Sequence, residues 1–303
     1  MGYFGRLFLP LFLVLAATGI WLAVEHERDT VFALAPADDG LAAIAPALGP
    51  SRAHSATQPA GAPPARERFA RPFDGGNSRP RVAVIVTGLG LAREATLRAI
   101  EDTPPEVTLA FTPYAEKLAP LVERARAKGH EILLAVPMEP ADPRRRDAGP
   151  AALAATLTEA AARQRLAWMF GRIHSHVGIV GDLGDRIARD PIAMKPVLDE
   201  LAARGLVYVA NRLEGGETAT GVQVASNGVP AAAVSVWLDR ELSGDAIDRE
   251  IAEAEAQARR GGAVVVLAQP YPVTLARIAA WMKAFDRKAL VAAPITAVAR
   301  GGS

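Results

Sequence analysis

The sequence predicts an α/β fold with parallel strands, arranged as a distorted and incomplete β/α barrel. Short β-branched runs recur from residue 81 onward, each with the length of a buried strand. Longer Ala- and Arg-rich segments with helical spacing of apolar residues separate these runs. The number of repeats favours a barrel over an open doubly wound sheet, which is the alternative. The predicted strands are 82–86, 107–111, 132–136, 177–180, 206–209, 234–238, 263–267 and 290–292.

The segments between the predicted strands show the apolar spacing of surface helices. Glycines follow several of them, at Gly129, Gly205 and Gly261-Gly262, where a helix that ends before a strand requires a left-handed residue. One domain over residues 81–303 accommodates the whole pattern. The predicted helices are 115–128, 151–170, 191–204, 245–260 and 273–287.

The composition excludes several classes of function. Half of the 303 residues are hydrophobic, which is enough for a large core, and the formal net charge is only +1. Such a balance gives no general attraction to nucleic acid, so no nucleic-acid partner is expected. The chain has no cysteine, which removes disulfides and thiolate chemistry together.

The N-terminal region predicts a membrane anchor. Residues 7–24 form an uncharged apolar run that is just long enough to cross a bilayer as a helix. Arg6 precedes it and acidic residues follow it, so residues 1–6 are expected in the cytoplasm and the main domain in the periplasm. The chain would then be a single-pass protein of the inner membrane. A cleaved signal peptide is the alternative, with a distant small-x-small site at Ala33-Leu34-Ala35.

Residues 25–80 are rich in Pro, Ala, Gly and Ser and predict a flexible linker. His26 and His54 lie in this segment, where we expect solvated imidazoles without a chemical role. Three of the five histidines therefore remain in the predicted domain.

The carboxyl ends of the predicted strands carry a polar rim. In a parallel β/α fold, reactive groups gather at these ends. Hydroxyl, carboxyl and amide groups there suit a sugar or another hydroxylated ligand, but no histidine follows any of these strands. Arg186 and Arg212 offer positive charge beside the acids. The predicted ligand-binding residues are Thr87, Glu139, Asp182, Asp185, Asn211, Asp239 and Gln269.

Several segments carry a more specific signal. VTLAFTPYA at 107–115, GHEILLAVPMEP at 129–140, DAGP at 147–150, RGLVYV at 204–209 and QPYPVTL at 269–275 resemble, in order and spacing, the divergent polysaccharide deacetylases. The resemblance spans about residues 81–296. It implies a distorted β/α barrel in which a divalent metal held by Asp and His activates water against an acetyl carbonyl. A glycan or cell-wall polysaccharide is then the expected partner.

The polar positions of that family are changed in this chain. Where the family has Ile-Asp-Asp-Leu-Gly after the first strand, this sequence has Val-Thr-Gly-Leu-Gly at 86–90. Asp182 stands where the family has a histidine, Asn211 stands in its Val-Asp-Ser motif, and Gln269 stands in its Gly-His-Pro motif. Base, metal ligands and acid are therefore replaced, which predicts impaired catalysis.

A rebuilt metal site is the competing interpretation. In extended backbone, His174 and His176 would share one face and, with Asp182, are the candidate ligands for zinc. These histidines precede the fourth strand whereas the acid follows it, so solvated imidazoles are the simpler reading. Glu139, held between two prolines, is the candidate catalytic acid or base, or else a structural loop residue. The other rim acids are explained equally well as helix caps or ion-pair partners.

Three functions follow and remain open. The first is a catalytically impaired deacetylase-like protein that binds or helps to process cell-envelope glycan. The second is an active metal-dependent carbohydrate deacetylase with a rearranged site. The third is a structural or regulatory envelope protein that uses the barrel to bind a protein partner.

Overall fold

The computed structural model describes residues 62–184, 186–211 and 228–300. The predicted anchor at residues 7–24 lies outside this part of the chain, as do Asp185, Arg212 and most of the predicted linker. Within the described ranges no helix combines the length and the apolar character that crossing a membrane requires. The anchor and the periplasmic location therefore stay predictions.

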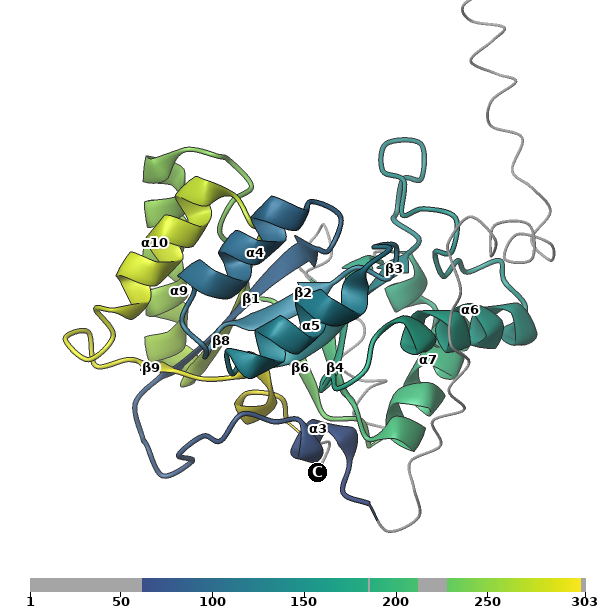
Figure 1. The fold of residues 1–303 in the computed structure, drawn as a ribbon, viewed down its shortest axis with the longest axis horizontal. Coiled ribbons are helices and arrows are strands. Elements are labelled where there is room, and N and C mark those ends of the chain that lie inside the picture. Colours follow the sequence, from purple (N-terminus) through teal and green to yellow (C-terminus); the bar gives the residue numbers. More distant parts are fainter. Residues whose placement is uncertain (1–61, 185, 212–227, 301–303) are drawn as a thin grey trace, which may run out of the picture. The chain divides into compact units, whose positions relative to one another are not determined.

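The described residues form a nine-stranded sheet in which every paired strand runs parallel, as the sequence predicts (Figure 1). Its order is β6-β5-β4-β3-β2-β1-β8-β7, with β9 also paired to β1. This is a parallel-strand half-barrel of the α/β class. The strands are β1 (Arg81–Leu89), β2 (Thr108–Phe111), β3 (Ile132–Met138), β4 (Gly178–Leu183), β5 (Val207–Ala210), β6 (Ala231–Ala233), β7 (Val236–Trp237), β8 (Ala263–Ala268) and β9 (Val291–Ala292).

The strand predicted at 234–238 is observed as the shorter β7, and a further strand that was not predicted, β6, precedes it at 231–233. The chain changes partner between these two strands, because β6 pairs with β5 and β7 pairs with β8. Between them, Val234 N donates to Ala210 O at 2.8 Å and Ser235 N donates to Val265 O at 2.8 Å. This short segment therefore links the two ends of the sheet.

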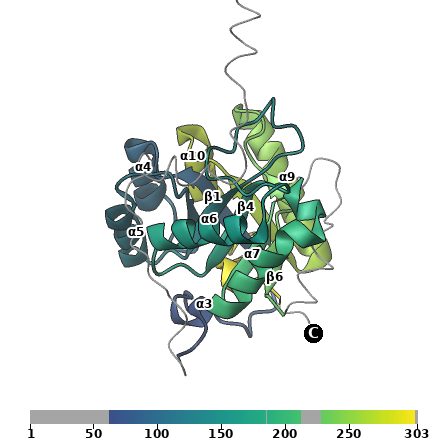
Figure 2. The same cartoon turned by 90° about the vertical axis from the view of Figure 1, so that its right-hand side faces the viewer.

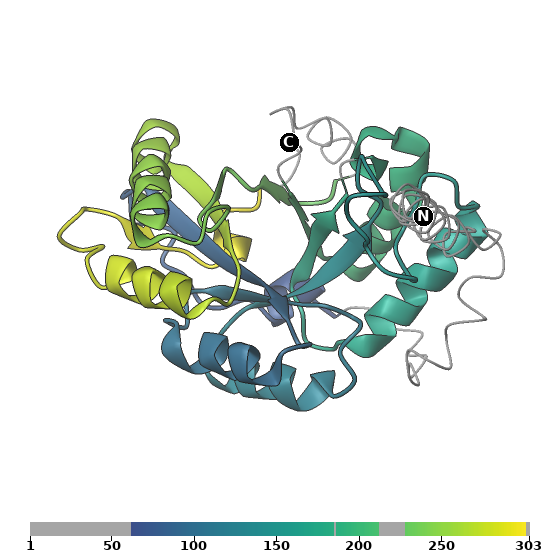
Figure 3. The ribbon, with the colours of Figure 1, turned by 90° about the horizontal axis from the view of Figure 1, so that it is seen from above.

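The helices pack on the outer face of the curved sheet (Figures 2 and 3). The helix α4 was not among the predicted ones, because it is short, polar and without a capping side chain. Three of the predicted glycine caps are confirmed, with φ values of 93° at Gly129, 63° at Gly205 and 75° at Gly262. The helices are α3 (Ala65–Arg68), α4 (Arg93–Asp102), α5 (Leu118–Ala127), α6 (Glu159–Arg172), α7 (Pro191–Arg204), α9 (Gly244–Gly261) and α10 (Pro272–Met282), with 3-10 turns η1 (Ile187–Arg189) and η2 (Ile295–Ala297).

Alternate residues of each strand belong to two separate apolar cores. In β1, Val82, Val84 and Val86 pack outward against the helices, whereas Ala83 and Ile85 pack inward. The inner core fills the concave side of the sheet, and Ile295 of η2 contributes to it. The half-barrel is therefore a packed scaffold, and any ligand site must lie at one end of its strands.

Residues 62–80 lie within the predicted flexible linker but pack on the domain. Ala65 is buried, Phe69 packs against the outer core, and Arg66 N donates to Gly205 O at 3.0 Å. Arg71 N donates to Glu131 Oε1 at 2.9 Å. The ordered domain consequently starts before residue 81, because two apolar side chains and several backbone bonds hold this segment.

Candidate functional site

The candidate site is the rim formed by the carboxyl ends of the strands. All three exposed large apolar side chains of the described residues belong to segments that follow strands at this end: Leu91 after β1, Ile192 at the start of α7 and Leu242 before α9. Single exposed apolar residues are normal on a protein surface, so these three gain meaning only from their shared position at this end of the strands. Sequence reasoning missed these three residues, and only Leu242, in Arg-Glu-Leu-Ser-Gly, stands out in the sequence as a single apolar residue among polar ones.

The first group of rim residues lies where β7, β8 and β1 end. Asp239 is buried, and its two oxygens accept from Trp237 Nε1 at 2.9 Å and from Gln269 N at 2.7 Å. Burial raises the pKa of Asp239 even though these two donors lower it. Its carboxyl group thus fixes the backbone of Gln269 rather than facing a ligand.

Gln269 and Thr87 lie next to each other across β8 and β1. A Cβ atom added at Gly88, which has φ of 72°, would lie 4.0 Å from Gln269 Oε1. The same oxygen accepts from the Tyr271 hydroxyl at 3.3 Å. The register of β1 against β2 also shifts between Val86 and Leu89, so a bulge occurs at this position. Bulges often occur next to functional sites because they redirect side chains.

The second group lies where β3 and β4 end, and Glu139 is its most constrained member. Glu139 Oε1 accepts from Arg186 Nη1 at 2.9 Å, and Oε2 accepts from Ala155 N at 2.9 Å. Its backbone N also donates to Leu153 O at 2.7 Å. Both carboxylate oxygens are engaged in holding the loop after β3, which supports the structural alternative for this residue over the acid or base role.

Asp182 differs from the other described rim acids. It is partly buried at the end of β4, and burial raises the pKa of its carboxyl group, with only the backbone N–H of Leu183 acting in the opposite direction. No side chain of the described residues bonds to it. Burial raises the pKa of Tyr114, and the negative charge of Asp182 acts in the same direction. A desolvated carboxyl group without a side-chain partner is available to a ligand.

The backbone next to Asp182 is strained. Leu183 has φ of 63°, a left-handed conformation that costs a side-chain-bearing residue about 1–2 kcal/mol. Gly184 follows with φ of 66°, and a Cβ atom there would lie 3.2 Å from Met138 Cβ. Strain of this kind persists where the surrounding structure imposes it, and it concentrates at functional sites.

The two candidate histidine ligands do not come together with Asp182. Ser175 between them has φ of 62°, so the backbone is not extended there, and His174 is exposed while His176 is buried. His176 stacks on Phe170 with ring centroids 5.7 Å apart. Both precede β4, about 20 Å of strand away from Asp182.

The metal that the family resemblance implies does not fit the residues present. Among the described residues, no three His, Asp or Glu side chains are grouped so that they could hold an ion. Asn211 follows β5 at the rim, and Asp185 lies outside the described residues. No chemical step is therefore derived through a metal.

His130 and Glu131 lie at the opposite, amino-terminal end of the strands. The nitrogens of His130 contact Val107 O at 2.8 Å and Ile100 O at 3.1 Å. Glu131 accepts from Arg71 N and from the backbone and hydroxyl of Thr296. These bonds tie distant segments together, which is the structural role expected at this end of a barrel.

The chain belongs to the divergent polysaccharide deacetylase family, which it matches over residues 84–299. It is 22% identical over 208 residues to an uncharacterized protein of Haemophilus influenzae, covering 68% of this chain and 72% of the relative. The crystal structure of an uncharacterized protein from Agrobacterium tumefaciens C58 is 29% identical, with a TM-score of 0.75 over 80% of this chain and 97% of that one. A structure from Enterococcus faecalis V583 shares the fold at 12% identity, with a TM-score of 0.51, over 73% of this chain and all of that one.

Proposed function

We propose that this protein binds a cell-envelope glycan at the carboxyl-end rim of its half-barrel and does not hydrolyse it by metal-dependent deacetylation. The observation that carries the proposal is Asp182, a partly buried rim carboxyl with no side-chain partner in the described residues. Family membership supports a carbohydrate-related function. Leu91, Ile192 and Leu242 on the same rim supply apolar contacts for the faces of sugar rings.

The absence of hydrolysis is supported by the changed rim chemistry. Thr87 and Gly88 lie at the end of β1 where the resemblance expects two aspartates, and Gln269 follows β8 where it expects a histidine. Glu139, the candidate acid or base, has both oxygens engaged by Arg186 and Ala155. General acid and base catalysis needs a group within hydrogen-bonding reach of the reacting atoms, and these residues offer none.

The location is part of the proposal. The apolar run at residues 7–24 supports a single-pass inner-membrane anchor with the domain in the periplasm. A glycan of the envelope would be present in that compartment. Fractionation of cells that express a tagged chain tests this point, and recovery of the tag in the soluble cytosol would contradict it.

The binding proposal is tested with the purified protein and two probes, a chitooligosaccharide and a peptidoglycan fragment. We expect saturable binding of at least one probe, with spectral changes at the rim near Trp237. Release of acetate from either probe, dependent on zinc, nickel or cobalt, would contradict the proposal and support the rearranged enzyme. Absence of binding to both would support the protein-partner alternative.

A further inference from the structure

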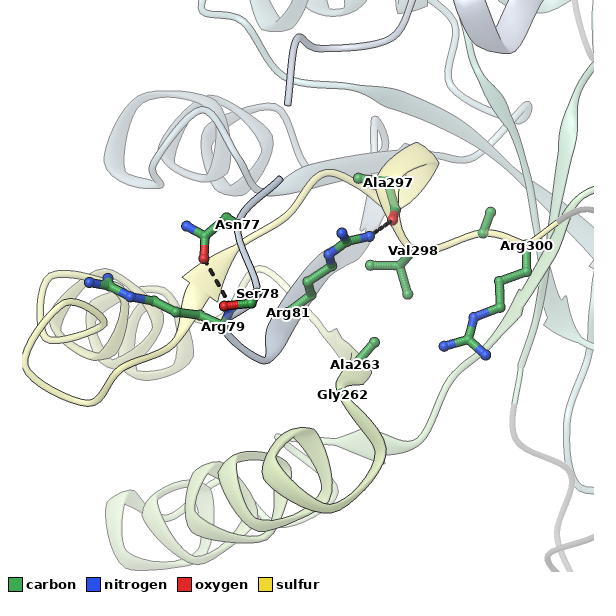
Figure 4. A pocket seen from close by; sticks show the side chains of 10 residues that line it. Asn77, Ser78, Arg79, Arg81, Gly262, Ala263, Ala297, Val298 and Arg300 are labelled. Atoms are coloured by element: carbon green, nitrogen blue, oxygen red, sulfur yellow. Dashed lines mark hydrogen bonds between the residues drawn. The ribbon is translucent and has the colours of Figure 1, made fainter. Parts of the chain in front are cut away.

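A second site lies at the opposite end of the strands from the rim. A pocket of about 490 Å³ opens between the starts of β1 and β8 and the C-terminal segment after η2 (Figure 4). Three of its ten lining residues are arginines and none is acidic. The lining is Asn77, Ser78, Arg79, Arg81, Gly262, Ala263, Ala297, Val298, Ala299 and Arg300.

Arg81 is the fixed cation of this pocket. Its Nη1 donates to Ala297 O at 3.1 Å and its Nη2 donates to Gly75 O at 3.1 Å. The guanidinium carbon also lies 5.2 Å from the ring centroid of Phe73. These contacts hold the guanidinium in place and leave further N–H donors for a ligand, since a guanidinium has five. Binding then costs little side-chain entropy.

Arg300 supplies a second cation from a different segment, on another wall of the pocket (Figure 4). Its backbone is anchored, because Arg300 N donates to Ala231 O at 2.9 Å and Ala231 N donates to Arg300 O at 2.8 Å. Its exposed side chain has no partner among the described residues. Arg79 contributes less, because its guanidinium points away from Arg300 and pairs with Asp286 at 2.9 Å.

The space between these cations is open. Gly262 has φ of 75°, and a Cβ atom added to it would meet nothing within 4 Å. A second pocket of about 370 Å³ shares Arg81 and Ala297 with the first and is lined by two further arginines, Arg66 and Arg71, against one acid, Glu67. Arg66 and Arg71 are already paired, with Glu67 at 3.7 Å and with Glu106 at 2.7 Å, so Arg81 is the cation that the two pockets share.

We propose that the pocket between Arg81 and Arg300 binds a phosphate group. Cationic donors that line one pocket from different segments can reach several oxygens of a tetrahedral anion, whereas a planar carboxylate pairs best with a single guanidinium. The Ser78 hydroxyl lies in the same lining as a neutral donor. A volume of about 490 Å³ also leaves room for the organic part of a phosphomonoester or of a phospholipid headgroup. The site is separate from the proposed glycan rim.

The test uses the full chain and two probes that distinguish the sources of the phosphate. Inorganic phosphate is titrated and followed by phosphorus NMR line broadening. In parallel, phosphatidylcholine vesicles with and without phosphatidylglycerol are sedimented with the protein. Arg300→Ala removes one cation without breaking any contact, Arg300→Lys retains the charge, and Arg145→Ala removes an exposed arginine from the opposite end as the matched control.

We expect Arg300→Ala to weaken binding about tenfold, as the loss of a charge-assisted hydrogen bond predicts, and Arg145→Ala to leave it unchanged. This pattern with inorganic phosphate assigns a soluble phosphate ligand, and the same pattern only with phosphatidylglycerol assigns a lipid headgroup.

Arg81→Gln, checked by thermal unfolding, should weaken binding at least as much. Absence of binding to both probes, or equal effects of Arg300→Ala and Arg145→Ala, would overturn the proposal. Neither result bears on the rim, which Asp182 variants test independently.

Discussion

His176 illustrates how a single buried side chain can control the response of this domain to pH. Both of its ring nitrogens are buried, and neither has a hydrogen-bond partner among the residues that the structure describes. Burial lowers the pKa of His176 to about 3, and the positive charge of Arg204 acts in the same direction. The imidazole is therefore neutral in the folded protein, whereas it becomes protonated below a pKa of about 6.5 in the unfolded chain.

Because the folded pKa of His176 is the lower one, stability is retained above pH 6.5 and is lost as the pH falls toward 3. We expect the wild type to lose about 2 kcal/mol of unfolding free energy through this group between pH 7 and pH 5. His176→Phe should remove this loss, and His174→Ala, at an exposed position, should not. Urea unfolding at both pH values measures the unfolding free energy. An equal loss between pH 7 and pH 5 for wild type and His176→Phe would contradict the assignment.

The rim acids show what the sequence could and could not predict at this scale. The strand ends predicted that Glu139, Asp182 and Asp239 would lie on one rim, because parallel strands present their carboxyl ends on the same side. The sequence could not show which carboxyls are already engaged. One donor to Glu139 and one donor to Asp239 come from residues 16 and 30 positions away, at Ala155 and Gln269. That Asp182 has no side-chain partner among the described residues is visible only in the folded structure.

The loop after β3 is held at both ends. Glu139 fixes its start through Arg186 and Ala155. At the other end, the Tyr114 hydroxyl donates to Ala148 O at 3.0 Å and accepts from Ala151 N at 3.1 Å. A Cβ atom at Gly149 would lie 2.7 Å from this hydroxyl oxygen, so glycine is required there. Burial raises the pKa of Tyr114, which keeps the hydroxyl protonated and able to donate.

Tyr114→Phe tests the role of that hydroxyl in the loop. The change leaves Ala151 N without its acceptor and Ala148 O without its donor, which should cost about 1–3 kcal/mol of unfolding free energy. Amide hydrogen exchange at Ala151 should become faster. Tyr271→Phe is the control, since that hydroxyl bonds only to the partly exposed Gln269 side chain. Unchanged exchange at Ala151 would show that other contacts hold the loop.

Most elements of the fold were predictable, because the spacing of the apolar residues and the positions of the cap glycines indicate the same helix and strand boundaries along the chain. The helix α7 is the clearest case, with Asp190 accepting from Ile192 N and Ala193 N at its start and Gly205 at its end. The strand β6 and the change of partner after it were not predictable, because three alanines in a row give no strand signal. The polar helix α4 lacked a capping signal.

The folded domain as a whole begins earlier than its first strand. Phe69 packs on the outer core and its carbonyl accepts from Arg126 Nη1 at 2.7 Å. Glu131, buried at the amino-terminal end, joins Arg71 to Thr296 near the end of the described chain. Burial raises the pKa of Glu131, which its hydrogen bonds partly offset. The composition of residues 62–80 predicted a linker, because the few apolar residues that pack on the domain are surrounded by Pro and Arg.

A chain that starts at residue 81 should therefore be less stable than one that starts at residue 62. The shorter chain loses the burial of Ala65 and Phe69 and the bond from Arg71 to Glu131, together worth about 3 kcal/mol or more. Thermal unfolding of both chains measures this loss. The full chain is the control, and equal midpoints for the chains that start at 62 and 81 would show that residues 62–80 contribute nothing.

The central claim concerns the whole protein, a half-barrel that binds glycan at its rim through Asp182. Asp182→Ala should leave the fold intact, because the native environment already disfavours the charged carboxylate. The most direct test is calorimetric titration of a peptidoglycan fragment into wild type, Asp182→Ala and Asp102→Ala, which changes an exposed aspartate at the opposite end. We expect binding that Asp182→Ala weakens about tenfold and Asp102→Ala leaves unchanged. Equal affinity in all three proteins would contradict it.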